Sequence, residues 1–190
     1  MTEAVRSFFE GIVFMKLQRI ETERLLLREL KVRDAEHIYK TWTSDPRVTK
    51  FMSYVTHESA DVTKGWLAEV EKQNEDENSD RLIWGLELKS TGQLIGSCDV
   101  VYKPEYQKWS IGYNIAFDYW NKGYTTEAAK AVVEYLSSMG VKHFCASHAV
   151  DNPASGRVME KIGMKFWRDG CCQCHDGKVF EAKYYILDID

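Results

Sequence analysis

The chain has 190 residues, of which 44% are hydrophobic and 28% are charged, and its formal net charge is −4 at pH 7. These values are typical of a globular protein with one domain and a sizeable core, and the acidic balance argues against nucleic acid as the main partner. Because the sequence has no run of about 18 apolar residues, it predicts no transmembrane helix and no membrane partner.

The N-terminal segment carries a short apolar run, residues 8–15, which Glu10 interrupts. No small-residue cleavage site follows this run, which argues against a signal peptide. We therefore expect a cytoplasmic protein with reduced thiols. Met15 is an alternative start, so we assign residues 1–14 to an N-terminal appendage and residues 15–190 to a single domain.

Apolar residues at helical spacing predict two helices early in the chain. The first is expected to have Asp34 as its N-cap and to end at Ser44-Asp45-Pro46, because a proline disfavours helix in the residue before it. The second is expected to begin near Ser59 and to bury Val62. The acidic stretch that follows, residues 71–80, is predicted to be a solvated loop.

Apolar and aromatic runs bounded by turn residues predict strands. The predicted strands are Arg24–Leu30 and residues 82–88, 93–101, 109–117, 141–150, 165–170 and 179–187. A helix is predicted between the strands at 109–117 and 141–150, with Gly140 as its stop. Another is predicted to start at Asn152-Pro153, an N-cap followed by proline. The order of elements indicates a mixed α/β fold with an antiparallel first half.

The turn around Gly123 joins the end of a predicted strand to the start of a predicted helix. The first N–H groups of a helix lack intrahelical partners and carry partial positive charge, so such a turn binds anions, phosphates above all. Gly123 permits a tight turn, and Lys122 adds a positive charge. The residues alone indicate a candidate pyrophosphate cradle, although an ordinary turn with one glycine fits equally well.

A cysteine cluster lies between the last two predicted strands. Its members are Cys171, Cys172, Cys174 and His175, which match the C-x-x-C-H pattern of haem attachment and include ligands that zinc accepts. No export signal accompanies the haem pattern, and no second C-x-x-C pair completes a zinc site. We therefore expect thiols on a loop, without metal or cofactor.

Several segments of this chain resemble the GNAT N-acetyltransferases. The segments that carry the resemblance to the family are Ile111-Gly112-Tyr113, Tyr119–Ala128, Asn152–Ser155 and Val158–Met164. Two further segments, Glu21–Arg28 and Ser44–Val48, are similar to the ribosomal-protein N-terminal acetyltransferase-like branch. The two longer motifs occur at the family's separation and with matching flanks, which makes the resemblance specific.

The resemblance implies a GNAT fold of the α/β (α+β) class, in which a mixed, splayed central sheet has helices on both faces. It implies that acetyl-CoA, the cosubstrate, lies in the splay with its pantetheine chain along Ile115 and Phe117. The residues that would meet its pyrophosphate are Asn121, Lys122, Gly123, Tyr124, Thr125 and Thr126. Asn121, where the branch often has glycine, and Thr125, where alanine or glycine is expected, depart from the family's loop.

The resemblance also places Asn152 near the pantetheine arm and Ser155 near the thioester sulfur, so both are candidate catalytic and cofactor-binding residues. Each has an ordinary alternative, because Asn152 can be simply an N-cap and Ser155 simply an N3 residue. Met159 stands where many members have a tyrosine acid. Ser110 stands where the branch often has a glutamate that serves as a base.

The implied reaction is direct attack of a primary amine on the acetyl thioester in a ternary complex. A peptide α-amine has a pKa of ~7.7–8.0 and a lysine ~10.4, so the missing glutamate base slightly favours a protein N-terminus as acceptor. Asp99 and Glu87 are alternative bases, equally credible as ordinary strand residues. An antibiotic or polyamine acceptor, and a non-catalytic acyl-CoA-binding domain, remain alternatives. Strand edges near the C-terminus suggest a homodimer.

Overall fold

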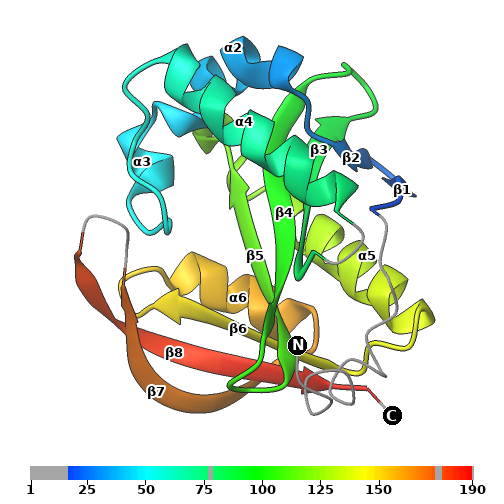
Figure 1. Ribbon diagram of the computed structural model, residues 1–190. Helices are drawn as coiled ribbons and strands as arrows, with labels where there is room; N and C mark the ends of the chain where they lie inside the picture. Colours follow the sequence, from blue (N-terminus) through cyan, green and yellow to red (C-terminus); the bar gives the residue numbers. More distant parts are fainter. Residues whose placement is uncertain (1–16, 77–78, 174–176, 190) are drawn as a thin grey trace, which may run out of the picture.

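The computed structural model describes residues 17–76, 79–173 and 177–189. Its centre is an eight-stranded sheet in the order β1-β2-β3-β4-β5-β6-β8-β7 (Figure 1). The strands are β1 (Ile20–Glu21), β2 (Leu25–Glu29), β3 (Arg81–Leu88), β4 (Leu94–Lys103), β5 (Lys108–Ile115), β6 (His143–Ala149), β7 (Lys165–Gln173) and β8 (Val179–Asp188). Strands β1 to β5 pair antiparallel with their neighbours in chain order, which confirms the antiparallel first half.

Helices and short helical turns connect the strands. They are η1 (Val32–Asp34), α2 (Ala35–Ile38), the π-helical turn η2 (Tyr39–Thr43), α3 (Pro46–Thr49), α4 (Ala60–Glu75), η3 (Phe117–Tyr119), α5 (Tyr124–Ser138) and α6 (Pro153–Lys161). Ser59 begins α4 as predicted, because its side chain accepts a hydrogen bond from the Val62 N–H at 3.3 Å. Gly140, with a φ of 93°, ends the turn that follows α5, as expected of a helix-stopping glycine.

The helices cover both faces of the sheet (Figure 1). On one face α2, η2 and α4 enclose a core that includes Leu30, Trp42 and Ile83. On the other face α5 and α6 enclose a larger core. Val132 of α5 and Met159 of α6 are at most 1% exposed there. The predicted mixed sheet with helices on both faces is therefore confirmed.

The sheet splays between β5 and β6. These two strands run parallel, but they pair only at Trp109↔Phe144 and Ser110↔Cys145. Beyond Ser110 they diverge, as Figure 1 shows, and β6 continues its pairing with β8 alone. The carboxyl-terminal half of β5 therefore has a free edge, and such crevices at strand ends are common ligand sites in α/β folds.

Asp34 occupies the predicted N-cap position of α2, but it does not cap the helix with its side chain. Its side chain makes no cap hydrogen bond to α2, and instead it accepts from Arg28 Nη1 and the Lys31 N–H, both at 2.9 Å. An N-cap residue has an extended backbone, whereas Asp34 closes the turn η1 with φ −80° and ψ −7°. Aspartate is a favourable N-cap residue, but the turn η1 gives Asp34 a helical backbone in place of the extended one that a capping side chain needs.

The predicted loop at residues 71–80 is also wrong in its first half, because α4 continues to Glu75. Val70 and Asn74 keep the inner face of this turn buried. The Asn74 amide donates to the carbonyl of Ile83 at 3.3 Å and accepts from its N–H at 3.4 Å. The predicted buried Val62 is 46% exposed, and Thr63 takes the inward position. Packing against β3 therefore extends α4 into a stretch whose acidic composition had predicted a loop.

The cysteine segment is less of a loop than predicted. Strand β7 runs through Cys171 and Cys172, which pair with Glu181 and Phe180 of β8. The remaining members of the predicted cluster, Cys174 and His175, lie outside the described residues, as does the predicted appendage 1–14. The short helix α3 was not predicted. It begins directly after the predicted helix stop, and Asp45 is its N-cap, because the Asp45 side chain accepts a hydrogen bond from the Arg47 N–H.

Candidate functional site

The free edge of β5 offers backbone groups to the splay. The N–H of Ala116 donates to the carbonyl of Ile95 at 2.8 Å, so it points toward β4. Because successive residues of a strand turn their backbone groups to opposite sides, the N–H groups of Tyr113 and Ile115 point away from β4. They face the region where β6 has departed.

Trp120 fixes the turn that leaves β5. Its indole N–H donates to the carbonyl of Ile115 at 2.8 Å, and its ring lies 4.9 Å from the ring of Phe117. The carbonyl of Ile115 thus already has a partner, while its N–H stays on the splay side. The Phe117 ring also lies beneath the Arg47 guanidinium, 3.7 Å from centroid to Cζ.

Two residues with positive φ shape the loop before α5. Gly123 has a φ of 81° and occupies the N-cap position of α5. Asn121 has a φ of 59°, and asparagine is one of the few residues with a side chain that visits this left-handed region routinely. The departure from glycine at position 121 is therefore compatible with the backbone that the loop adopts.

The first turn of α5 has no side-chain cap, since Gly123 provides none. The first backbone bond into the helix runs from the Glu127 N–H to the carbonyl of Gly123 at 3.1 Å. The N–H groups of Tyr124, Thr125 and Thr126 precede this bond and lack intrahelical partners. Together with the helix dipole they form a site suited to an anion. The Lys122 ammonium lies 5.3 Å from the ring centroid of Tyr119.

Arg24 and Glu127 hold this loop against β2. Glu127 accepts hydrogen bonds from Thr22 Oγ1 at 2.6 Å and from the Arg24 N–H at 2.9 Å, and it pairs with the Arg24 guanidinium at 2.6 Å. Arg24 Nη1 also donates to the carbonyl of Lys122 at 3.0 Å. Burial raises the pKa of Glu127, but the hydrogen bonds from Thr22 and Arg24 outweigh it and leave the pKa lowered.

The start of α6 lies across the splay from β5. Asn152 Oδ1 accepts from the Ser155 N–H at 3.4 Å, so the predicted N-cap is confirmed. The Tyr113 hydroxyl of β5 lies 3.0 Å from Ser155 Oγ and donates to the Ser155 carbonyl at 2.9 Å. Burial raises the pKa of Tyr113, which keeps the phenol protonated. The structure therefore joins Ser155 of α6 to β5 through a pair of hydroxyl groups.

Sequence reasoning missed three residues of this site: Tyr113, Arg24 and Glu127. Each stands inside a segment that carried the family resemblance, but the resemblance assigned no role to it. Alternation along β5 was the available signal for Tyr113, because it shares a face with Ile111 and Ile115. No local pattern linked Arg24 to Glu127, since 103 positions separate them.

Of the two alternative bases, Glu87 is engaged elsewhere. It accepts from Arg28 Nε at 2.6 Å, and Arg28 also pairs with Asp34. This three-membered network is half-buried beside η1, so Glu87 is a structural ion-pair partner. Asp99 lies on β4 and pairs with Arg81 at 2.9 Å.

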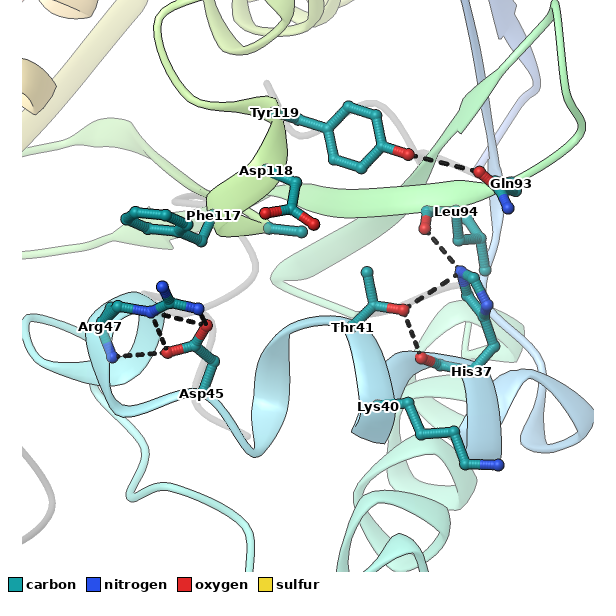
Figure 2. A pocket seen from close by; sticks show the side chains of 11 residues that line it. His37, Lys40, Thr41, Asp45, Arg47, Gln93, Leu94, Phe117, Asp118 and Tyr119 are labelled. Atoms are coloured by element: carbon teal, nitrogen blue, oxygen red, sulfur yellow. Dashed lines mark hydrogen bonds and ion pairs between the residues drawn. The ribbon is translucent and has the colours of Figure 1, made fainter.

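A polar pocket of about 270 Å³ adjoins the end of β5 on the α2 side (Figure 2). Its wall comprises His37, Lys40, Thr41, Asp45, Arg47, Gln93, Leu94, Ala116, Phe117, Asp118 and Tyr119. Figure 2 shows His37 directed at the Leu94 carbonyl, which it contacts at 2.7 Å. The lining carries both signs of charge and so indicates no particular ligand.

Within residues 17–76, 79–173 and 177–189, no group of three or more His, Cys, Asp or Glu side chains is arranged to hold a metal ion. No helix in these ranges is long and apolar enough to cross a membrane.

Comparisons with known proteins agree with this architecture. Residues 24–165 match the family described as Acetyltransferase (GNAT) domain. The N-acetyltransferase YnaD of Bacillus subtilis (strain 168) is 34% identical, in an alignment that covers 88% of this chain and 95% of that protein. The crystal structure of a GNAT-family acetyltransferase from Bacillus anthracis has a TM-score of 0.76 at 26% identity, covering 90% of this chain and 98% of that one.

Two more distant structures contain ligands. The microcin C7 self-immunity acetyltransferase MccE, in complex with acetyl-CoA and AMP, has a TM-score of 0.76 at 18% identity over 88% of this chain and 94% of its own. RimL, the ribosomal L7/L12 α-N-protein acetyltransferase, in complex with coenzyme A, has a TM-score of 0.76 at 16% identity over 91% of this chain and 99% of its own. These two likenesses show the shared fold. With a family match across most of its length and a relative above 30% identity along nearly all of it, the chain belongs to the GNAT family of N-acetyltransferases.

Proposed function

We propose that the protein transfers the acetyl group of acetyl-CoA to a primary amine by direct attack in a ternary complex. The observation that carries this proposal is the splay itself. An uncapped α5 terminus lies at one end of the free β5 edge, and the Tyr113–Ser155 hydroxyl pair crosses the splay at 3.0 Å. An anion-binding terminus beside a reactive strand edge suits a long cosubstrate with a phosphate end and a thioester end.

The described residues fit acetyl-CoA in four respects. The N–H groups of Tyr124, Thr125 and Thr126, with Gly123 at the N-cap, suit the pyrophosphate. The backbone of the loop residues Asn121 and Lys122 borders the same pyrophosphate position. The N–H of Ile115, on the splay side at the end of β5, suits the pantetheine chain, whose amides pair as another strand would. Phe117 lies in η3 and not on the predicted strand, and its carbonyl accepts a hydrogen bond from the Trp120 N–H. Asn152 and Ser155 lie on the far side. The structures of MccE, in complex with acetyl-CoA, and of RimL, in complex with coenzyme A, support acetyl-CoA as the cosubstrate by analogy of fold.

Acetyl-CoA supplies an activated thioester to the site. The amine nitrogen attacks the carbonyl carbon with its lone pair, and the carbonyl oxygen gains negative charge. The N–H groups of Tyr113 and Ile115 are positioned to stabilise that charge. As the C–S bond breaks, Ser155 Oγ donates its proton toward the departing sulfur, while the Tyr113 hydroxyl keeps its own proton and holds Ser155 in place through hydrogen bonds. The nitrogen releases its surplus proton to water, and water returns a proton to Ser155, so the products are an amide and a free thiol.

We further propose an α-amine as acceptor. An α-amine at pKa ~7.7–8.0 is partly deprotonated at neutral pH, whereas a lysine at ~10.4 needs a strong base. Glu87 is committed to Arg28, Asp99 is paired with Arg81 and Ser110 offers no carboxylate, so an acceptor that needs little deprotonation suits this site. RimL, which shares the fold, acts on a protein α-amine as its name states.

The first test is a calorimetric titration of acetyl-CoA into wild type and the Gly123→Trp variant. We expect binding by wild type and its loss in the variant, because an indole at position 123 fills the turn beside the free N–H groups. Gly140→Trp is the matched control, since Gly140 also has a positive φ and lies at the other end of α5. It carries the same backbone strain and should bind normally.

Activity is measured as the release of free thiol with three acceptors: an unblocked peptide, an N-blocked lysine peptide and a polyamine. Turnover of the unblocked peptide alone supports the α-amine proposal. Turnover of the polyamine reassigns the acceptor class. Binding of acetyl-CoA with no turnover of any amine indicates a non-catalytic acyl-CoA-binding domain. Failure of folded wild type to bind acetyl-CoA contradicts the proposed function altogether.

A further inference from the structure

A polar patch lies on the sheet face opposite α5 and α6. Cys98, Val100 and Ile111 point into the α5–α6 core. Because side chains alternate across a strand, their neighbours Asp99 of β4 and Gly112 of β5 occupy the other face, directly opposite each other in register. Mid-sheet positions on a covered face are ordinarily apolar. Polar residues here therefore need an explanation.

Asp99 leans across the sheet toward β5. Arg81 Nη2 donates to its Oδ2 at 2.9 Å. Its other oxygen, Oδ1, lies 2.5 Å from the place that a Cβ on Gly112 would occupy. A side chain at position 112 would displace this carboxylate, so the glycine makes room for it. The result is a half-buried carboxylate oxygen over the middle of the strand that borders the splay.

Asn114 presents a second acceptor on the same face. Its Nδ2 donates to Ser97 Oγ at 2.7 Å, and Ser97 is its register partner on β4. That bond directs Oδ1 away from Ser97, and among the described residues this buried oxygen has no hydrogen-bond partner. A buried acceptor without a partner is costly. Asn114 is a diagonal neighbour of Asp99 across the β4–β5 pair.

Tyr54 lies in the segment between α3 and α4, near enough to Asp99 for that carboxylate's charge to act on its hydroxyl. Its ring stacks on Trp66 with centroids 6.3 Å apart and an interplanar angle of 24°. Its hydroxyl is buried and, within the described parts of the chain, has no hydrogen-bond partner. Burial, reinforced by the charge of Asp99, raises the pKa of Tyr54. The hydroxyl therefore stays neutral, lies within the electrostatic reach of Asp99 and keeps free lone pairs.

These three groups share one chemical property, since each offers an oxygen that accepts hydrogen bonds. A primary ammonium has three N–H donors and a positive charge, and it matches a carboxylate with two neutral oxygens. Arg81 already neutralises part of the Asp99 charge. The two neutral oxygens therefore contribute to ligand selection through the positions at which they accept hydrogen bonds. The patch also flanks Tyr113, whose N–H faces the splay. A group bound here lies beside the position assigned to the thioester.

We propose that Asp99, Asn114 and Tyr54 form the subsite that binds the primary ammonium of the acceptor. This inference rests on the proposed function for its role in catalysis, but the binding itself does not require turnover. The subsite selects an unsubstituted ammonium, because each N–H that a methyl group replaces leaves one of the three oxygens without a donor. It therefore defines the acceptor's reactive end, whose nitrogen releases one proton to water before it attacks the thioester.

The test separates binding from turnover. Thermal unfolding of the acetyl-CoA-saturated protein is measured with n-butylammonium chloride and with tetramethylammonium chloride at matched ionic strength. A ligand that binds only the folded state raises the Tm. We expect the primary ammonium to raise the Tm of wild type and tetramethylammonium to leave it unchanged. The shift should vanish in Asp99→Asn and shrink in Tyr54→Phe.

Asp188→Asn is the matched control, because Asp188 is also an ion-paired strand carboxylate, bound to Lys108 at 2.7 Å on a different strand. Its ammonium response should equal that of wild type. With an amine that turns over, KM for that amine should rise roughly tenfold or more in Asp99→Asn and about threefold or more in Tyr54→Phe. The affinity for acetyl-CoA should not change. Tyr54→Phe removes only the hydroxyl and keeps the ring on Trp66.

Equal stabilisation of wild type by both ammonium salts, or none by either while acetyl-CoA binds, overturns the subsite and leaves the proposed function standing. An unchanged amine KM in both variants overturns it as well. Failure to bind acetyl-CoA, by contrast, overturns the proposed function.

Discussion

Asn121 illustrates how one backbone angle decides what a substitution means. Its φ of 59° lies in the left-handed region, where a β-branched residue meets a steric cost of about 1–2 kcal/mol. We expect Asn121→Val to lower the free energy of unfolding by about this amount and Asn121→Gly to leave it nearly unchanged. Urea denaturation measures both. Lys122→Val, one position along, is the control, and an equal loss there contradicts the argument from φ.

The Ser155 hydroxyl is the second residue-scale test. If it donates a proton to the departing sulfur, Ser155→Ala should lower kcat roughly a hundredfold, at the lower end of general acid–base contributions. Tyr113→Phe should also lower kcat, because the Tyr113 hydroxyl lies 3.0 Å from Ser155 Oγ and holds it in position by a hydrogen bond. Steady-state kinetics and acetyl-CoA calorimetry check both variants.

Neither variant should change the affinity for acetyl-CoA. Ser138→Ala is the control, since its hydroxyl bonds only the nearby carbonyl of Tyr135 at the far end of α5. A normal kcat in Ser155→Ala would reduce this serine to an N3 residue of α6, which is the ordinary alternative that the sequence left open.

At the scale of elements, the Arg24–Glu127 pair ties β2 to the first turn of α5. The pKa of Glu127 is lowered in the folded protein. A carboxyl with a depressed folded pKa stabilises the fold above its unfolded pKa, about 4.3, and that stability is lost as the pH falls through the folded pKa. We therefore expect Glu127→Gln to be less stable than wild type at pH 7, with the difference shrinking below about pH 4.

Thermal unfolding from pH 7 to pH 3 measures this difference. Glu134→Gln is the control, because Glu134 lies on the same helix in an exposed pair with Lys130 at 3.7 Å. It should match wild type at every pH. A constant gap between Glu127→Gln and wild type across this range would show that the pair contributes packing and not charge.

The start of α6 shows what local sequence predicts well. Asn152 and Pro153 are chemically suited to a helix start, and the cap forms as expected. By contrast α4 extends to Glu75 beyond its predicted end, because Asn74 bonds β3. Caps depend on neighbours in sequence, whereas helix ends such as that of α4 depend on partners elsewhere in the chain.

At the scale of the whole molecule, we predict that the domain begins at Met15. Leu17 is 5% exposed, and the Trp84 indole donates to the carbonyl of Gln18 at 2.7 Å. A protein that starts at Met15 should keep the Tm and acetyl-CoA affinity of the full chain. One that starts at Glu21 should lose several degrees of Tm, because it leaves a buried indole N–H without its acceptor. Equal Tm values for the two truncations would contradict this boundary.

The sequence by itself determined the family, the α/β class, most strand and helix positions and the loop at Gly123, because each depends on residues close together in the chain. It predicted Asn152 and Ser155 from a motif. Only the tertiary structure brought Glu127 to Arg24, Ser155 to Tyr113, and Asp99 beside Gly112. These contacts join residues from different strands and loops, and no periodicity encodes which of them meet. Asp99 looked like an ordinary polar strand residue until the sheet register placed it diagonally from Asn114, whose buried Oδ1 has no hydrogen-bond partner among the described residues.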